Sequence, residues 1–177
     1  APYGILKNTY SVNPGEIVTI NSHGEKKTQT YWSFPDWNSN DFQSKTQFDD
    51  IADKLEEAVK IELVSDVPIG SFLSGGVDSP LISFYAQQNS KGDFNTFSMG
   101  SDSNVHDESI QAKLYAQSMG ANHHSTYMTA ENSLEALDRA VESAGEPFGD
   151  FSIIPTWQIS KLAREKVTVV LSGDGGD

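Results

Sequence analysis

The fold of this chain is decided by the segment Val67–Ser79, which reads VPIGSFLSGGVDS. Its apolar run ends in a Gly-Gly turn, and a helix is predicted to start near Pro80, as in a strand–turn–helix unit. A second loop of similar build, Leu171–Asp177 (LSGDGGD), follows the apolar run Val167–Leu171. Two Gly-rich loops that each carry Ser and Asp indicate a candidate site for phosphate and metal.

From Asp66 onward, short apolar runs alternate with helical patterns. Strands are predicted at Val67–Leu73, Phe94–Met99, His123–Tyr127 and Val167–Leu171. Helices are predicted at Pro80–Gln88, Glu108–Met119, Leu134–Ala144 and Ile153–Arg164. The alternation predicts an α/β fold with a doubly wound parallel sheet. Ligands bind such sheets beyond the carboxyl ends of the strands, where the strand order reverses. If the first and last strands are neighbours there, the two Gly-rich loops face each other.

The N-terminal part has a different pattern, with short β pieces at Ile17–Ile20 and Thr28–Trp32 around turn signals. Residues 1–38 are therefore predicted to be a small β piece plus linker, and residues 39–177 an α/β domain. A helix with one apolar face from Phe48 to Leu63 should open that domain, with Thr46 as its cap. The chain begins without Met and stops inside a Gly-rich loop, so we expect a piece of a longer protein.

Composition restricts the partners. The formal net charge is −13, from 12 Lys and Arg against 25 Asp and Glu. Such a chain offers no basic cluster for nucleic acid or for an anionic membrane surface. There is no cysteine, which excludes disulfides and thiolate chemistry in this chain and is compatible with a cytoplasmic location. No apolar run approaches the roughly 20 residues that a membrane span needs.

The loop Ser74–Ser79 has the composition of an anion site. Gly75 and Gly76 let the backbone approach a ligand, and the next helix directs its N–H groups to the same place. No Lys follows the glycines, so it is not a Walker loop. Asp78 is out of place beside an anion unless Mg²⁺ bridges it to phosphates, with Asp177 or Asp174 as its counterpart. The alternative is that Asp78 only caps the following helix and that the Gly-rich segments are ordinary turns between strand and helix.

The same residues resemble a known family. The signature Ser-Gly-Gly-x-Asp-Ser of the PP-loop ATP pyrophosphatases is complete at Ser74–Ser79. The segment Pro68–Ser79, read with Phe94–Gly100 and Leu171–Asp177, resembles the synthetase domain of glutamine-dependent asparagine synthetases. The later Ser-Gly-(Glu/Asp)-Gly-x-Asp-Glu motif of that family is matched at Ser172–Asp177, up to its final Glu. The resemblance covers about residues 40–177, and residues 1–34 look more loosely like the closing strands of the family's glutaminase domain.

The resemblance implies a role for each matched residue. The AMP part of ATP would be framed by Leu73, Met99, Ser172 and Gly173. Pyrophosphate would be held by Ser74, Gly75, Gly76, Val77, Asp78 and Ser79. Mg²⁺ would be held by Asp78 and Asp177. Asp174 stands where many relatives carry a Glu near the reacting centre, and Pro80 replaces a usual second Ser.

The implied reaction is ATP-dependent amide formation. An aspartate carboxylate would attack the α-phosphorus of ATP, releasing pyrophosphate, and glutamine-derived ammonia would then displace AMP. The implied partners are ATP, aspartate, ammonia and a glutaminase domain in the same full-length chain, and a homodimer is compatible with them. Two alternatives stay open: the same adenylation on another carboxylate, such as a sugar acid or a β-lactam precursor, and an ATP-binding module without catalysis.

Two other polar pairs are weighed against this site. His123 and His124 are adjacent in a predicted strand and therefore point to opposite faces, which favours packing over metal binding. Asp107 and Glu108 stand at a predicted helix start, where acidic charge is favourable to the helix dipole, and this role is preferred to a catalytic one.

Overall fold

A computed structural model describes residues 3–34, 48–102, 107–147 and 149–174. The chain divides into two compact units, Ala1–Thr46 and Gln47–Asp177, and each is described by itself. The predicted boundary between residues 38 and 39 and the predicted cap Thr46 lie outside the described residues. In the described ranges, no helix is both long and apolar enough to cross a bilayer.

The first unit contains an antiparallel hairpin of β1 (Glu16–Ile20) and β2 (Lys26–Thr30). Asn21 closes its turn, because the Asn21 side-chain oxygen accepts the backbone N–H groups of His23 at 3.0 Å and Glu25 at 2.9 Å. The first predicted strand is confirmed. The second begins at Lys26 rather than Thr28, since the turn between the strands is shorter than the polar composition indicates.

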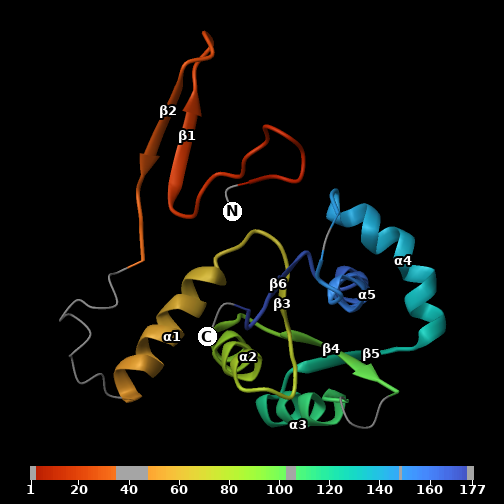
Figure 1. The fold of residues 1–177 in the computed structure, drawn as a ribbon. Helices are drawn as coiled ribbons and strands as arrows, with labels where there is room; N and C mark the ends of the chain where they lie inside the picture. Colours follow the sequence, from red (N-terminus) through yellow and green to blue (C-terminus); the bar gives the residue numbers. More distant parts are fainter. Residues whose placement is uncertain (1–2, 35–47, 103–106, 148, 175–177) are drawn as a thin grey trace. The chain divides into compact units, whose positions relative to one another are not determined.

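The second unit is a parallel sheet with helices between its strands (Figure 1). Its elements, in chain order, are α1 (Phe48–Glu62), β3 (Ile69–Phe72), α2 (Asp78–Asn89), β4 (Asn95–Ser101), α3 (Ser109–Met119), β5 (Asn122–Met128), α4 (Ala130–Ala144), α5 (Ile153–Arg164) and β6 (Val169–Leu171). The strand order is β5-β4-β3-β6. The predicted α/β class with a doubly wound parallel sheet is confirmed.

The strand order reverses between β3 and β6. From β3 the chain moves outward to β4 and then β5, and it returns to the other side of β3 for β6. Ile69 pairs with Val169, and Ser71 pairs with Leu171. The expectation that the first and last strands are neighbours at the switch point is therefore confirmed, and both Gly-rich loops leave the sheet at this place.

Helices cover both faces of the sheet (Figure 1). On the face of α2 and α3, one core cluster is centred on Phe94 and another on Leu73, which packs on Ala112 and Ala116 of α3. On the opposite face, Phe97 packs with residues of α5 and the segment after it. Coverage on both sides is consistent with the wholly apolar sequence of β6, Val-Val-Leu.

α4 begins four residues before its predicted start at Leu134. Thr129 and Asn132 form a capping box: the Asn132 amide donates to the Thr129 hydroxyl at 3.2 Å, and the Thr129 amide donates to the Asn132 side chain at 2.9 Å. The apolar pattern begins later than the cap, so periodicity alone places the start too late. α5 begins and ends where it was predicted.

His123 and His124 are packing residues on opposite faces of β5. The His123 ring nitrogens lie 2.9 Å from the Thr96 hydroxyl and 3.1 Å from the Ser98 hydroxyl. His124 bonds the Asn95 side chain at 2.9 Å and stacks on Phe97, with 5.3 Å between the ring centroids. Each ring is held in place by strand β4, as expected for packing rather than metal binding.

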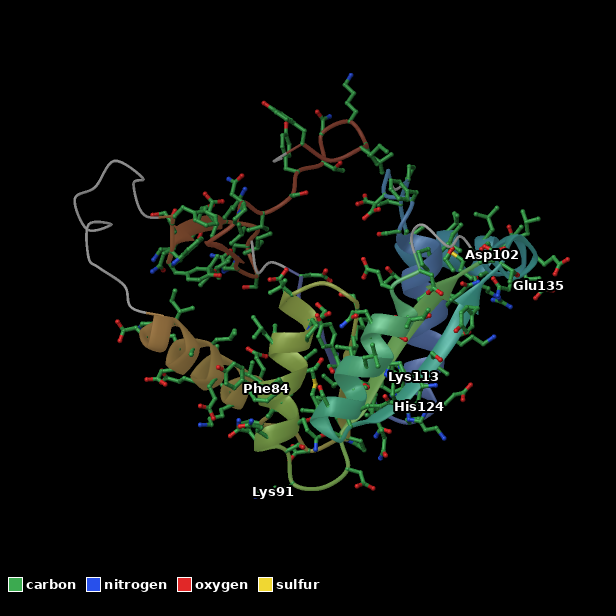
Figure 2. The ribbon with its side chains drawn as sticks, turned by 90° about the horizontal axis from the view of Figure 1, so that it is seen from below. Phe84, Lys91, Asp102, Lys113, His124 and Glu135 are labelled. Atoms are coloured by element: carbon green, nitrogen blue, oxygen red, sulfur yellow. The ribbon has the colours of Figure 1, made fainter. Side chains whose placement is uncertain are left out.

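These two rings predict a pH dependence of stability. Burial is the main cause that lowers the pKa of both histidines from the ordinary 6.5, and neighbouring positive charge, from His124 and Lys113 at His123 and from Lys166 at His124, lowers it further (Figure 2 labels His124 and Lys113). The unfolded chain therefore takes up protons first as pH falls, so the free energy of unfolding should decrease below about pH 6.5. Urea unfolding at pH 7.5 and 5.5 measures this.

The control is chosen to separate these rings from other histidines. His123→Gln combined with His124→Gln should flatten the dependence between pH 7.5 and 5.5, whereas His23→Gln, in the exposed hairpin turn, should leave the slope unchanged. Carboxylates with a lowered pKa, such as Asp107, start from 3.8 and titrate below this window. Equal slopes for the wild type and the double variant would contradict the prediction.

Candidate functional site

The first Gly-rich loop is closed by bonds within itself. Leu73 is buried, and its amide donates to the Phe97 carbonyl at 2.7 Å, which fixes the end of β3 against β4. The Ser74 amide donates to the Ser79 hydroxyl at 2.8 Å, and the two hydroxyls lie 2.8 Å apart. The Gly76 amide donates to the Ser74 hydroxyl at 3.2 Å. The Ser74 and Gly76 amides thus turn inward, around the Ser74 and Ser79 side chains.

α2 starts inside this loop, at Asp78. Val77 is its N-cap and makes no side-chain capping bond, and Asp78 is an exposed carboxylate in the first turn. Pro80 is buried in the same turn, where proline is tolerated because it needs no helical hydrogen bond. The positive end of the helix dipole is therefore directed at the loop.

The second loop lies directly against the start of α2. Gly173 has no side chain, and a Cβ there would lie 2.7 Å from the Ser79 nitrogen and 3.1 Å from the Asp78 Cβ. The Ser172 hydroxyl donates to the exposed Asp174 carboxylate at 3.1 Å. Pairing of β3 with β6 brings the two loops to one edge, and the missing Cβ of Gly173 lets them touch.

A cavity of about 260 Å³ opens between the two loops. The cavity lies at the carboxyl ends of β3, β4 and β6, and residues at or near the start of α3 and in α5 complete its wall. The lining residues are Phe72, Leu73, Ser74, Ser79, Ser98, Met99, Glu108, Thr156, Ile159, Ser172, Gly173 and Asp174. Hydroxyl groups, two carboxylates and apolar side chains therefore surround one hollow beyond the carboxyl ends of the strands, which is the usual ligand position in such sheets.

The structure brings most of the predicted site residues together. The cavity wall includes Leu73, Ser74, Ser79, Met99, Ser172, Gly173 and Asp174. The predicted phosphate residues Gly75, Gly76, Val77 and Asp78 belong to the first loop but do not line this cavity, and the Val77 side chain is 70% exposed. Asp177 lies outside the described residues.

Glu108 is a site residue that the sequence did not identify. Its carboxylate Oε2 accepts a hydrogen bond from the Gly75 amide at 2.9 Å, across 33 positions of the chain. Acidic residues are favoured at the start of a helix, which explains why Glu108 stands where it does but does not predict its contact with the loop. The neighbouring Asp107 fits the predicted helix-start role: its carboxylate accepts the Ser109 amide at 3.0 Å, and hydrogen bonds from Ser109 lower its pKa.

The chemistry of the loops suits an anion. The Gly75 amide already holds one carboxylate oxygen, that of Glu108, which shows that the backbone here can hold an anionic oxygen. The Asp78 and Asp174 carboxylates are both exposed, one on each loop.

The donor set also fits Mg²⁺ that arrives with a phosphate. Among the described residues, no group of three or more His, Asp or Glu side chains is placed to hold a metal alone. Mg²⁺ commonly needs only one or two carboxylates when phosphate oxygens and water complete its coordination. Asp78 fits this requirement, because its exposed carboxylate stands next to the amides of the first loop.

Similarity to known proteins was compared for the whole chain. The model of the asparagine synthase family matches residues 50–177. A protein of Methanocaldococcus jannaschii, provisionally named glutamine-hydrolyzing asparagine synthetase 2, is 35% identical over 179 residues, which is 100% of this chain and 34% of that protein. Glutamine-hydrolyzing asparagine synthetase 1 of Bacillus subtilis is 32% identical over 94% of this chain and 26% of that protein.

Among solved structures, an NH3-dependent NAD synthetase from Campylobacter jejuni matches with a TM-score of 0.48 and 14% identity, over 71% of this chain and 56% of that one. The chain spans about a third or less of the two curated relatives, which are accordingly much longer proteins. The family model covers both Gly-rich loops and every strand of the parallel sheet. This chain belongs to the asparagine synthase family.

Proposed function

We propose that this chain is the nucleotide-binding part of an ATP-dependent amide ligase, which activates the side-chain carboxylate of aspartate as an acyl-adenylate. The observation that carries the proposal is the close approach of Gly173 to the start of α2, which closes two Gly-rich loops around one cavity. Membership of the asparagine synthase family supports ATP-dependent amidation in general.

In this proposal the first loop holds the departing pyrophosphate. Amides and hydroxyls of Ser74–Ser79 would bind its oxygens, together with the positive end of the α2 dipole. Leu73, Met99, Ser172 and Gly173 would frame the AMP part. Asp78 and Asp177 would hold Mg²⁺, which supplies charge neutralisation to the phosphates when it is bound. Asp174, on the second loop, would stand beside the reacting carboxylate.

The chemistry proceeds in two steps. An oxygen of the aspartate carboxylate forms a bond to the α-phosphorus of ATP, and the bond from that phosphorus to the oxygen bridging the α- and β-phosphates breaks, so that pyrophosphate leaves. Ammonia then attacks the acyl carbon, AMP leaves, and one proton is lost to give the amide. The residues of this chain serve the first step by positioning and by stabilising charge. A glutaminase domain of the full-length protein would supply the ammonia.

The test is the identity of the nucleotide products. Full-length protein with ATP, Mg²⁺, aspartate and ammonia should release AMP and pyrophosphate in equal amounts, and aspartate alone should support exchange of labelled pyrophosphate into ATP. Anion-exchange chromatography separates AMP from ADP. Release of ADP and phosphate would refute the proposed chemistry, and exchange with a sugar acid or a β-lactam precursor but not with aspartate would refute the acceptor.

A further inference from the structure

The loop proposed to bind pyrophosphate already carries an anion that belongs to the protein. Its amides at Ser74, Gly75 and Gly76 all donate hydrogen bonds. Two of these go to neutral hydroxyls of the loop itself, those of Ser79 and Ser74. Within the described ranges, the acceptor on Gly75 is the only charged one at these amides, and it comes from outside the loop: Glu108, at 2.9 Å.

Glu108 reaches the loop because Gly75 leaves room for it. A Cβ on Gly75 would lie 3.1 Å from the Glu108 Cβ and 3.2 Å from the Gln111 Cβ, closer than ordinary contact. α3, which carries Lys113 in Figure 2, begins at Ser109, one residue after Glu108. The position of the Glu108 carboxylate thus follows from where α3 begins.

The Glu108 carboxylate is free to leave. The residue is exposed and lines the cavity, so its side chain can turn to water without opening the core. No salt bridge of Glu108 occurs among the described residues, whose salt bridges involve Lys60 and Arg139. The bond to Gly75 therefore holds the carboxylate without a cation to retain it.

We propose that Glu108 is an intramolecular competitor for the phosphate loop: its carboxylate occupies the Gly75 amide and has to leave before a polyphosphate binds. The inference rests on the proposed function, in which Ser74–Ser79 receives pyrophosphate. Two costs oppose binding while Glu108 is present. The bond from the Gly75 amide must be exchanged, and a carboxylate that stays near the loop repels the incoming phosphates.

The test uses inorganic pyrophosphate as the probe, in buffer with EDTA, with affinity measured by isothermal titration calorimetry. Glu108→Ala should bind about tenfold to a hundredfold more tightly than the wild type, because a hydrogen bond to a charged group no longer has to be broken. Glu108→Gln should gain less, since its amide oxygen can still accept the Gly75 amide.

The matched control is Asp107→Asn. It removes the same charge one residue earlier, but Asp107 bonds the Ser109 amide and not the loop. Its affinity for pyrophosphate should stay within about twofold of the wild type, because exposed charges are screened by salt. Thermal unfolding checks that each variant is folded. If Glu108→Ala does not fold, the comparison with the wild type uses Glu108→Gln, which preserves the size of the side chain.

The outcomes separate this inference from the proposed function. Equal affinity of the wild type and both Glu108 variants would overturn the competition while leaving the loop as a pyrophosphate site. Weaker binding of pyrophosphate by both Glu108 variants than by the wild type would overturn the competition as well, because Glu108 would then support binding. The same holds if both variants bind ATP more weakly in the presence of Mg²⁺. Failure of all proteins, the wild type included, to bind pyrophosphate would overturn the proposed function and the inference together.

Discussion

Gly173→Ala is expected to reduce pyrophosphate exchange by about a hundredfold. The added Cβ would lie 2.7 Å from the Ser79 nitrogen, a distance that real Cβ contacts do not adopt, and the nearby atoms belong to the backbone and Asp78. The second loop must therefore move away from the start of α2. A displacement of about 1 Å at a catalytic site can cost on the order of 100-fold in rate.

Gly149→Ala is the matched control for this change. A Cβ at Gly149 would meet nothing within 4 Å, so the same substitution is made there without a clash. Exchange of labelled pyrophosphate into ATP is measured for both variants, and thermal unfolding shows whether each retains its fold. If Gly173→Ala keeps exchange within about twofold of the wild type, the contact between the two loops does not form the site.

Asp78→Asn is expected to lower ATP-dependent turnover by roughly 100- to 1,000-fold. Metal ions at a transferring phosphoryl group contribute several kcal/mol, and each 1.36 kcal/mol corresponds to about tenfold in rate. The fold should tolerate the change. Asp78 is exposed and stands in the first turn of α2, whose N-cap is Val77, so the loss of its charge costs only about 0.3–1 kcal/mol of helix stability.

Asp93→Asn is the control for this variant. Asp93 is exposed and stands two residues before β4 begins. It therefore lies at the amino end of the strands, whereas the two loops lie at their carboxyl ends. It should retain full turnover. Steady-state release of pyrophosphate at varied Mg²⁺ and ATP concentrations measures both. If Asp78→Asn preserves kcat, the proposed role of Asp78 in holding Mg²⁺ is wrong. ATP binding without any turnover in the wild type, weakened but not abolished by Asp78→Asn, would favour the ATP-binding module without catalysis over the ligase.

Sequence patterns predicted the sheet because both loops and strands are local features. Gly-Gly turns after apolar runs mark where strands end, and their positions followed from residues a few places apart. The ends of the strands were less well predicted. The strand was predicted over the largely apolar run from Val67 to Leu73, but β3 covers only Ile69–Phe72, because pairing depends on where the neighbouring strands begin and end.

A similar limit applies at β6. Val167 was predicted to open that strand, but its amide donates to the Ala163 carbonyl at 2.9 Å and closes the end of α5. Its side chain is buried beside Phe97, so the apolar residue serves the core without belonging to the strand. Hydrophobic periodicity reports burial, and burial is common to strands and to the helix ends beside them.

The contact of Glu108 with Gly75 could not be predicted by any local rule. It depends on two segments that are 33 positions apart and on the lack of a side chain at Gly75. Sequence patterns placed Gly75 after the first strand of the sheet, as found, and Glu108 as the first residue of a helix that begins one residue later, at Ser109. Only the parallel arrangement of β3 and β4 sets these boundaries side by side.

The pairing of β3 with β6 also has a consequence for how the protein is made. Ile69 and Val169 are 100 positions apart along the chain, so closing this pair has a larger entropic cost than closing any hairpin. Contacts of such long sequence separation form late in folding. The first loop is synthesised early, but its second wall does not exist until residues 169–174 have joined the sheet. During synthesis, the first loop is therefore made well before the strand and loop that complete the cavity.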